Sequence, residues 1–276
     1  MRLVLSLPRI SLPIAFVVAA TSASAQVIDL TINNTGLAIG DKPRVNGVRV
    51  NFRDRRLERV NGVNITIWNP YSPATGVVNG LALGLPVTGA KDINGIATGL
   101  FGAGADQSIK GIGIAPIGLG AGGDLSGIMI GGIGVGGGGS LTGIGIGGIG
   151  VGSGGDATGL FIGGVGVGSG GTLKGLSIGG IGVGAPDLQG VALSPIAAGG
   201  QRVHAIVVAG AYFKVDSGGR FDGGSISSFN HIKGAQHGLT IGLLNYAREL
   251  HGAQLGLINI SENGGRLRVL PVLSVR

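Results

Sequence analysis

The stretch Leu141–Asp156, LTGIGIGGIGVGSGGD, decides how the rest of the chain is interpreted. It is rich in glycine, its β-branched aliphatic residues alternate with glycine, and it holds a single charge. Four structures suit such a composition: a phosphate-binding loop, a membrane segment, a flexible linker, or one unit of a repeat. The sequence on either side distinguishes among them, because only a repeat predicts a fixed period.

A period of 16 residues is present. The glycines that begin each Gly-aliphatic-x-aliphatic unit are 16 residues apart, with a final interval of 15: Gly95, Gly111, Gly127, Gly143, Gly159, Gly175 and Gly190. We call this residue the opening glycine and number positions from it. Positions 1, 3, 6 and 8 are almost always aliphatic, and in the quoted unit they are Ile144, Ile146, Ile149 and Val151. Alternation of this kind is typical of short β-strands.

The two strands of a unit are separated by a dipeptide that indicates a corner. It is Gly147-Gly148 in the quoted unit and Ala115-Pro116 in another, and proline does not donate a ladder hydrogen bond. We therefore predict an all-β fold, a repeat β-solenoid with about 16 residues per coil, in which coils stack at about 4.8 Å. Positions 1, 3, 6 and 8 are expected to fill the core, which would leave a flat glycine face outside.

An outer-membrane β-barrel is the alternative fold, because its strands also alternate. Such barrels carry aromatic girdles and strands of about ten residues, whereas aromatic residues make up 4% of this chain. Residues 125–155 carry no charge, which suits a glycine-zipper membrane segment, but GGGGS and GSGG interrupt it before any span of about 20 residues.

The N-terminus has the three parts of a secretory signal peptide. Arg2 and Arg9 form a basic start, an apolar run follows, and Ala23-Ser24-Ala25 fits the cleavage rule. We expect a signal peptide over 1–25, an N-terminal lead-in or cap over 26–46, the glycine-rich solenoid over 47–202, and C-terminal coils with a cap over 203–276. The mature protein is then exported to the periplasm, the outer membrane or the cell surface, and without cysteine it has no disulfide.

Composition also bears on partners. The formal net charge is +7, and residues 42–60 are a basic segment that suits either a solvated strand face or contact with an anionic surface. Basic clusters interleaved with stacking aromatics are missing, so we do not expect nucleic acid. The G-x-G-x-x-G match at 145–150 recurs with the period and no helix pattern follows it, so we do not expect a nucleotide.

The C-terminal coils have their own motif. Gly234-Ala235-Gln236 and Gly252-Ala253-Gln254 begin such units, and Asn230, Asn245 and Asn259 share one column, where amides stack in ladders. This part of the chain resembles bacterial surface-repeat proteins built on G-x-Q-x-G-L-x-N units. The resemblance implies an exported, surface-associated repeat protein and no known activity.

One column contains candidate metal ligands. The residue before the opening glycine is His204, Asp222, His237 or His251 in successive C-terminal coils, and stacking would place these side chains about one rung apart. Imidazole and carboxylate at that spacing suit a divalent metal, and a polar edge ladder is the alternative. Calcium-binding nonapeptide repeats are not expected, because Asp124, Asp156 and Asp187 are about two coils apart.

Catalytic motifs are missing, since no G-x-S-x-G elbow sits between a strand and a helix, and we expect neither enzymatic activity nor a cofactor. The sequence predicts a structural or interaction repeat protein that contacts the outer membrane, a glycan or a second copy through the flat glycine face. The alternatives left open are a membrane-embedded barrel or pore, and a glycan- or metal-binding module on the C-terminal coils.

Overall fold

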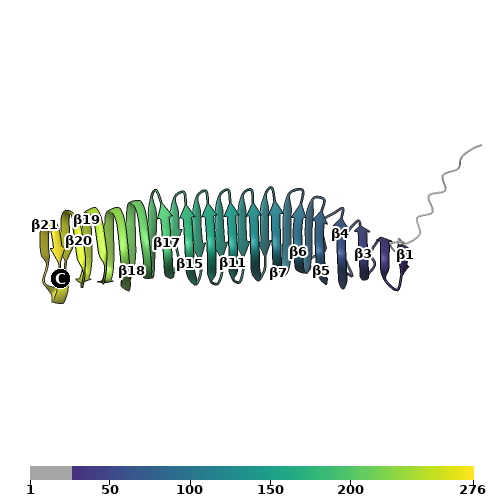
Figure 1. The fold of residues 1–276 in the computed structure, drawn as a ribbon, viewed down its shortest axis with the longest axis horizontal. Helices are drawn as coiled ribbons and strands as arrows, with labels where there is room; N and C mark the ends of the chain where they lie inside the picture. Colours follow the sequence, from purple (N-terminus) through teal and green to yellow (C-terminus); the bar gives the residue numbers. More distant parts are fainter. Residues whose placement is uncertain (1–26) are drawn as a thin grey trace, which may run out of the picture.

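Strands that run across the long axis of a rod make up most of residues 27–276, which are the residues that this computed structural model describes (Figure 1). The first and last coils lie at opposite ends of the rod. Of the two architectures that the sequence left open, the chain adopts the β-solenoid, with about fourteen turns of about 16 residues. Within the described residues no helix has the length and apolarity needed to cross a bilayer. The expected signal peptide, 1–25, falls outside the described residues.

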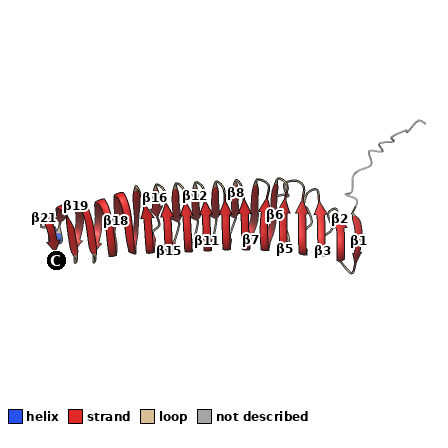
Figure 2. Ribbon diagram, turned by 45° about the horizontal axis from the view of Figure 1, so that its top comes forward, coloured by secondary structure: helices blue, strands red, loops and turns tan. Residues whose placement is uncertain are grey.

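Each coil has a long strand and a short strand, which Figure 2 shows repeated along the rod. The separate long strands are β3 Arg44–Asn51, β4 Arg59–Thr66, β5 Val77–Gly84, β9 Asp124–Gly131, β11 Leu141–Gly147, β13 Ala157–Gly163, β15 Thr172–Gly179 and β17 Asp187–Ser194. The separate short strands are β8 Gly118–Ala121, β10 Gly134–Gly137, β12 Gly150–Ser153, β14 Gly166–Ser169 and β16 Gly182–Gly184. In other coils the two run together, as β6 Val87–Gly99, β7 Gly102–Ala115, β18 Ala197–Gln236, β19 Leu239–Leu250 and β20 Ala253–Ser261.

Neighbouring coils pair in parallel and in the register that the period predicts. In the β11–β13 pair, Gly143 is opposite Gly159 and Ile144 is opposite Leu160. The opening glycine is required by the backbone: Gly143 has a φ of 115°, and a Cβ added there would overlap the carbonyl oxygen of Gly127 in the preceding coil. The glycine column therefore sets the repeat.

The phase of the coil is the opposite of the predicted one. Inward side chains occupy the second position before the opening glycine and positions 2, 4 and 8 after it, which in the quoted unit are Leu141, Gly145, Gly147 and Val151. Of the four columns expected in the core, only position 8 lies there. Positions 1 and 3 face outward, and position 6 lies on the corner, where Ile149 is 54% exposed.

The thinness of the coil explains this phase. The inward column at position 2 alternates small and large residues, since Gly145 lies between Met129 and Phe161 in adjacent coils. A Cβ added at Gly145 would already lie 3.0 Å from Val151 Cγ1 and 3.1 Å from Phe161 Cδ1. An isoleucine at every rung would overfill this space, so the regular aliphatic columns are outside and the irregular columns pack the core.

The insertion at 209–221 does not break the stack. It lies within β18, and Gly223 sits over Ala205, because a Cβ added at Gly223 would overlap the Ala205 carbonyl oxygen. Phe213 and Phe221 fill the enlarged interior with ring centroids 5.1 Å apart, and both are fully buried. The C-terminal coils thus continue the same solenoid beyond residue 202.

Both ends of the stack are closed by antiparallel strands. At the N-terminal end β1, Ile28–Ile32, pairs antiparallel with β2, Thr35–Ile39. At the C-terminal end a short 3₁₀ turn, Asn263–Gly265, leads into β21, Arg268–Val275, which pairs antiparallel with β20. These reversals end the parallel stacking, and β1 and β21 become the two edge strands of the sheet.

Candidate functional site

The most extensive surface feature is an apolar face on the long strands. It consists of the outward side chains at positions 1 and 3, and we call it the aliphatic face. In the coil that Gly111 begins, Ile112 is 38% exposed and Ile114 is 46% exposed. The members are Leu37, Ile39, Val48, Val50, Val63, Ile65, Leu81, Leu83, Ile96, Ile112, Ile114, Ile128, Ile130, Ile144, Ile146, Leu160, Ile162, Leu176, Ile178, Val191, Leu193, Ile206, Val208, Ile226, Leu239, Ile241 and Leu255.

The two capping strands extend the aliphatic face by one rung at each end. In β1, Leu30 is opposite Leu37 and is 64% exposed. In β21, Leu273 is opposite Leu255 and is 53% exposed. A cap that only closed the stack would gain solubility from polar outward residues, as terminal repeats of solenoids usually have. The aliphatic face instead continues to both tips of the rod.

A second apolar column follows the corner beside this face. Position 6 carries Ile117, Ile133 and Ile149, which are between 47% and 54% exposed. The chain bends at Gly148 and Ile149, one residue later than the predicted corner, and this places the position 6 side chain on the outside. Its outward placement corrects the prediction that position 6 belongs to the core.

The C-terminal coils place amides inside. The predicted asparagine ladder is confirmed: Asn230 Nδ2 donates to Asn245 Oδ1 at 2.7 Å, and Asn245 Nδ2 donates to Asn259 Oδ1 at 2.8 Å. Gln254 Nε2 donates to Gln236 Oε1 at 3.2 Å, and all five amides are buried. The asparagine amides satisfy one another along the ladder, whereas Gln254 Oε1 is buried without a hydrogen-bond partner.

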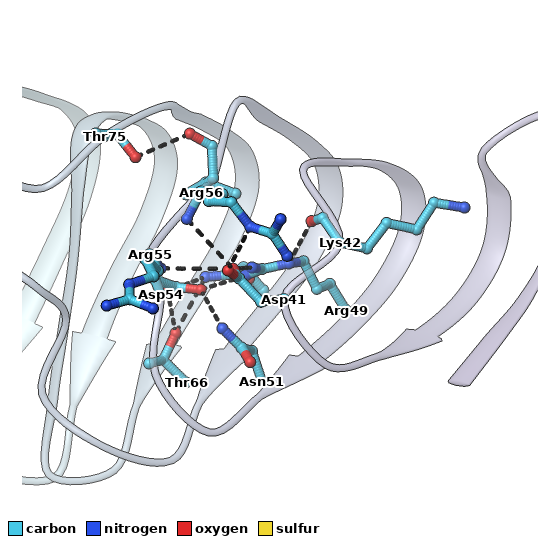
Figure 3. Close-up of polar contacts among 11 residues, drawn as sticks. Asp41, Lys42, Arg49, Asn51, Asp54, Arg55, Arg56, Thr66 and Thr75 are labelled. Atoms are coloured by element: carbon cyan, nitrogen blue, oxygen red, sulfur yellow. Dashed lines mark hydrogen bonds and ion pairs between the residues drawn. The ribbon is translucent and has the colours of Figure 1, made fainter. Parts of the chain in front are cut away.

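The basic segment 42–60 contributes a buried ion network, drawn in Figure 3. Arg49 is fully buried at position 2 of its coil, and its guanidinium donates to Asp54, to Asp41 at 2.8 Å and to Asn64 Oδ1 at 2.8 Å. Burial raises the pKa of Asp54, but the Arg49 charge and the hydrogen bonds from Thr66, Arg49 and Asn51 hold it below its usual value. Arg49 is therefore neither part of a solvated strand face nor available to an anionic partner.

A glycine face does exist, on the short strands rather than the long ones. We call it the glycine track, and it consists of the outward glycines at positions 7 and 9. A Cβ added at Gly118 or Gly136 would have no heavy atom within 4 Å. The members are Gly102, Gly104, Gly118, Gly120, Gly134, Gly136, Gly150, Gly152, Gly166, Gly168, Gly182 and Gly184.

The loop of residues 69–74 overhangs the N-terminal end of the glycine track. Beneath it is a hollow of about 450 Å³, lined by Pro70 and Tyr71 on one side and by Gly104 and Gly120 on the floor. The Arg53 guanidinium lies 3.6 Å from the Tyr71 ring centre, which holds the ring by a cation–π contact. The hollow is open, and its polar groups are few.

The four candidate metal ligands lie along one row, as the column predicts. Asp222 is 4.0 Å from His204 Nδ1 and 3.8 Å from His237 Nδ1, and His237 stacks on His251 with ring centres 4.9 Å apart. Arg220 already binds the carboxylate with two hydrogen bonds, at 2.6 and 3.0 Å, and lowers the pKa of Asp222.

Across residues 27–276 no three His, Cys, Asp or Glu side chains form a group that could hold a metal ion. A metal at the row would therefore require Arg220 to release Asp222 and the imidazoles to turn. The zinc site stays a prediction, and a zinc titration with His237→Ala as the comparison decides it.

The fourth histidine belongs to a different cluster. His231 Nδ1 is 2.8 Å from the Tyr212 hydroxyl, its ring stacks on Phe229, and Tyr246 meets it edge-on. Burial, followed by the charges of Lys233 and Lys214, lowers the pKa of His231, so this imidazole is neutral at pH 7. The comparison of columns misses this cluster, because Tyr212 belongs to the insertion at 209–221, which lies outside the 16-residue period.

The turn aspartates act as caps between coils. Asp124 Oδ1 accepts the backbone N–H and the hydroxyl of Ser140, both at 2.8 Å. Asp156 Oδ1 accepts the backbone N–H of Thr172 at 2.7 Å. The bonds from Ser140 lower the pKa of Asp124. Each acid thus satisfies a donor one coil ahead, which is a structural role.

Comparison with known proteins gives no assignment. No family model matches the chain, and neither a curated protein nor a solved structure is detectably similar to it.

Proposed function

We propose that this protein is an exported, non-catalytic structural or interaction protein of the bacterial cell surface or periplasm, and that it acts through the aliphatic face. The observation that carries the proposal is the continuity of that face from β1 to β21. About fourteen coils spaced about 4.8 Å apart give a strip about 67 Å long. Two outward columns about 7 Å apart give it a width of about 12 Å once the side-chain radii at both margins are included, which is roughly 800 Å².

An apolar surface of this size indicates a partner. Soluble monomers rarely expose contiguous apolar patches above a few hundred Å², and larger ones mark contact with a protein or a membrane. The glycine track does not offer comparable apolar area, because glycine has no side chain. We therefore move the expected interaction from the glycine face to the aliphatic face.

Pairing of carboxylates with arginines supports a non-catalytic role. Arg49 holds Asp41 and Asp54 in a fully buried network, and Arg220 holds Asp222. A catalytic acid or base needs a pKa near the working pH and access to substrate. The pKa values of Asp54 and Asp222 lie below their usual range, which is typical of paired carboxylates.

Export is supported by the N-terminal sequence and by the position of β1. The three-part pattern ends at Ala25, and β1 begins at Ile28, so cleavage there would leave the capping strand whole. The resemblance of the C-terminal coils to bacterial surface-repeat proteins supports the same location.

Cell fractionation tests this proposal. The full-length chain is expressed in a Gram-negative host beside a variant that lacks residues 2–25, and protease is added to intact cells and to spheroplasts. We expect the processed protein outside the inner membrane, and the truncated variant inside it. An unprocessed chain that stays in the cytoplasm would overturn the proposal.

A further inference from the structure

We propose that two copies of this chain associate in parallel, with their aliphatic faces packed against each other. The inference rests on the proposed function only in that both assign contact to this face. A stable interface buries about 800 Å² on each partner, which is the area that the aliphatic face offers. The occupant with the same length and the same spacing of ridges is a second copy.

The face is suited to pack against itself. Rows of side chains repeat with the rung spacing, so the ridges of one copy match the grooves of another along the whole rod. Sheets that pack face to face lie about 10 Å apart with their side chains interdigitated, and β-branched residues such as Ile128 and Ile144 form regular ridges. An interface that uses one patch on both copies is also the commonest kind among homo-oligomers.

Charges beside the face select the orientation. The third residue before the opening glycine lies on the same sheet face, and its sign changes along the rod. It is arginine near the N-terminal end, acidic in several central coils, arginine in two coils toward the C-terminal end and glutamate in the last coil: Arg44, Arg59, Asp92, Asp124, Asp156, Asp187, Arg202, Arg220 and Glu249. This charged edge lies on one side of the aliphatic face.

An antiparallel pair would bring the two charged edges together on the same side of the interface. The central aspartates of one copy would then face those of the other, and arginines would face arginines, which is unfavourable for desolvated like charges. A parallel pair, related by a two-fold axis along the rod, places the charged edges on opposite sides. The parallel arrangement therefore keeps the aliphatic contact without like-charge contacts.

The same edge does not favour a lipid surface. Asp92, Asp124, Asp156 and Asp187 beside the middle of the aliphatic face would be repelled by anionic headgroups, while the arginines toward the ends would be attracted, so the edge as a whole is not the basic surface that anionic lipid selects. A membrane would also contact the face at a depth that brings these carboxylates into the headgroup region. A second copy in the parallel orientation has no such conflict.

The absence of native cysteine makes a cross-linking experiment direct. Single cysteines are placed at Leu81, Ile144 and Ile206, which lie near the N-terminal quarter, the middle and the C-terminal quarter of the rod, and a bismaleimide with a reach of about 10 Å is added. In a parallel pair, each cysteine lies near the same cysteine of the partner, so all three variants cross-link. In an antiparallel pair, position 81 of one copy lies about eight coils, or roughly 38 Å, from position 81 of the partner and instead faces the partner's position 206.

Disruption is tested by light scattering after size exclusion. The mature chain is expected at twice its monomer mass, and Ile144→Asp with Ile146→Asp is expected to reduce it to the monomer mass. Gly136→Asp, on the glycine track, is the matched control and is expected to leave the dimer intact. Each variant is expected to fold, because residues 144, 146 and 136 all face outward. Far-UV circular dichroism checks that the fold is retained.

Several outcomes overturn the inference. These are a wild-type monomer at 100 µM, a dimer that the double variant does not affect, and cross-linking at Ile144 alone. Binding of the wild-type monomer to vesicles of phosphatidylethanolamine and phosphatidylglycerol would assign the face to lipid instead. A monomer in solution that is still exported leaves the proposed function standing with another partner.

Discussion

Replacing Phe161 by alanine tests which columns form the core. Phe161 is fully buried at position 2, and its neighbours in that column are Gly145 and Ser177 in the adjacent coils. Neither neighbour has a side chain long enough to fill the space that the ring leaves. The cost should therefore lie at the upper end of the range for Phe→Ala in cores, which is about 3–5 kcal/mol.

Phe101→Ala is the matched control, because it deletes the same atoms at an outward corner. Phe101 is 50% exposed, and surface substitutions usually change stability by no more than about 0.5 kcal/mol. The difference between the two variants should thus exceed about 2.5 kcal/mol. This comparison is insensitive to dimer formation, since neither residue belongs to the aliphatic face.

Hydrogen exchange by mass spectrometry, combined with urea unfolding followed by circular dichroism, measures both effects. Because coils contact only their neighbours, Phe161→Ala should speed exchange in residues 141–179 before it affects the ends of the rod. Equal destabilisation by the two variants would refute the assignment of position 2 to the core and would favour positions 1 and 3 as core positions instead.

Four further variants test the backbone and the buried charges. Gly143→Ala should destabilise by about 1–3 kcal/mol or more, because φ is 115° and the Cβ meets the preceding coil. Gly152→Ala, whose Cβ would be 3.9 Å from its nearest neighbour, should stabilise by about 0.4–1 kcal/mol, and thermal unfolding compares the two. Arg49→Met should cost about 3–5 kcal/mol, because it leaves the buried Asp54 without its cation and Asp41 with Arg56 alone, seen as faster hydrogen exchange in 41–66. The pKa of Asp54 is lower in the folded chain than in the unfolded one. The contribution of Asp54 to stability is therefore complete above about pH 4 and is lost as the pH falls through the folded pKa. The acid-unfolding transition of the N-terminal coils should shift in Asp54→Asn, and an unchanged transition would count against the network.

The period, the parallel register and the asparagine ladder could all be predicted from the sequence. Gly143 recurs at a fixed interval because its backbone angle excludes other residues, and such a constraint leaves a column that is visible in one sequence. The amides of Asn230 and Asn245 were likewise recognisable, because stacked amides satisfy one another at each rung.

The direction of the columns could not be predicted, because alternation shows which residues share a face but not which face is inside. Ile144 and Ile146 were assigned to the core because burial of aliphatic residues is the usual pattern. The space beside Gly145 decides otherwise, and it depends on Val151 and on Phe161 of the next coil. Arg49 was missed for the same reason, since its position in the inward column matters more than its charge.

The caps at β1 and β21 have a consequence for how this protein varies in length. Parallel stacking ends at the two strand reversals whatever the number of coils between them, and in residues 111–179 the inward column at position 2 repeats over two coils, one with a small residue and one with a large residue. A duplication or deletion of a pair of these units would therefore alter the rod by two rungs of about 4.8 Å each, keep large side chains off adjacent rungs and leave both ends unchanged. The length of the rod can therefore change by the insertion or loss of coils while both end strands stay the same.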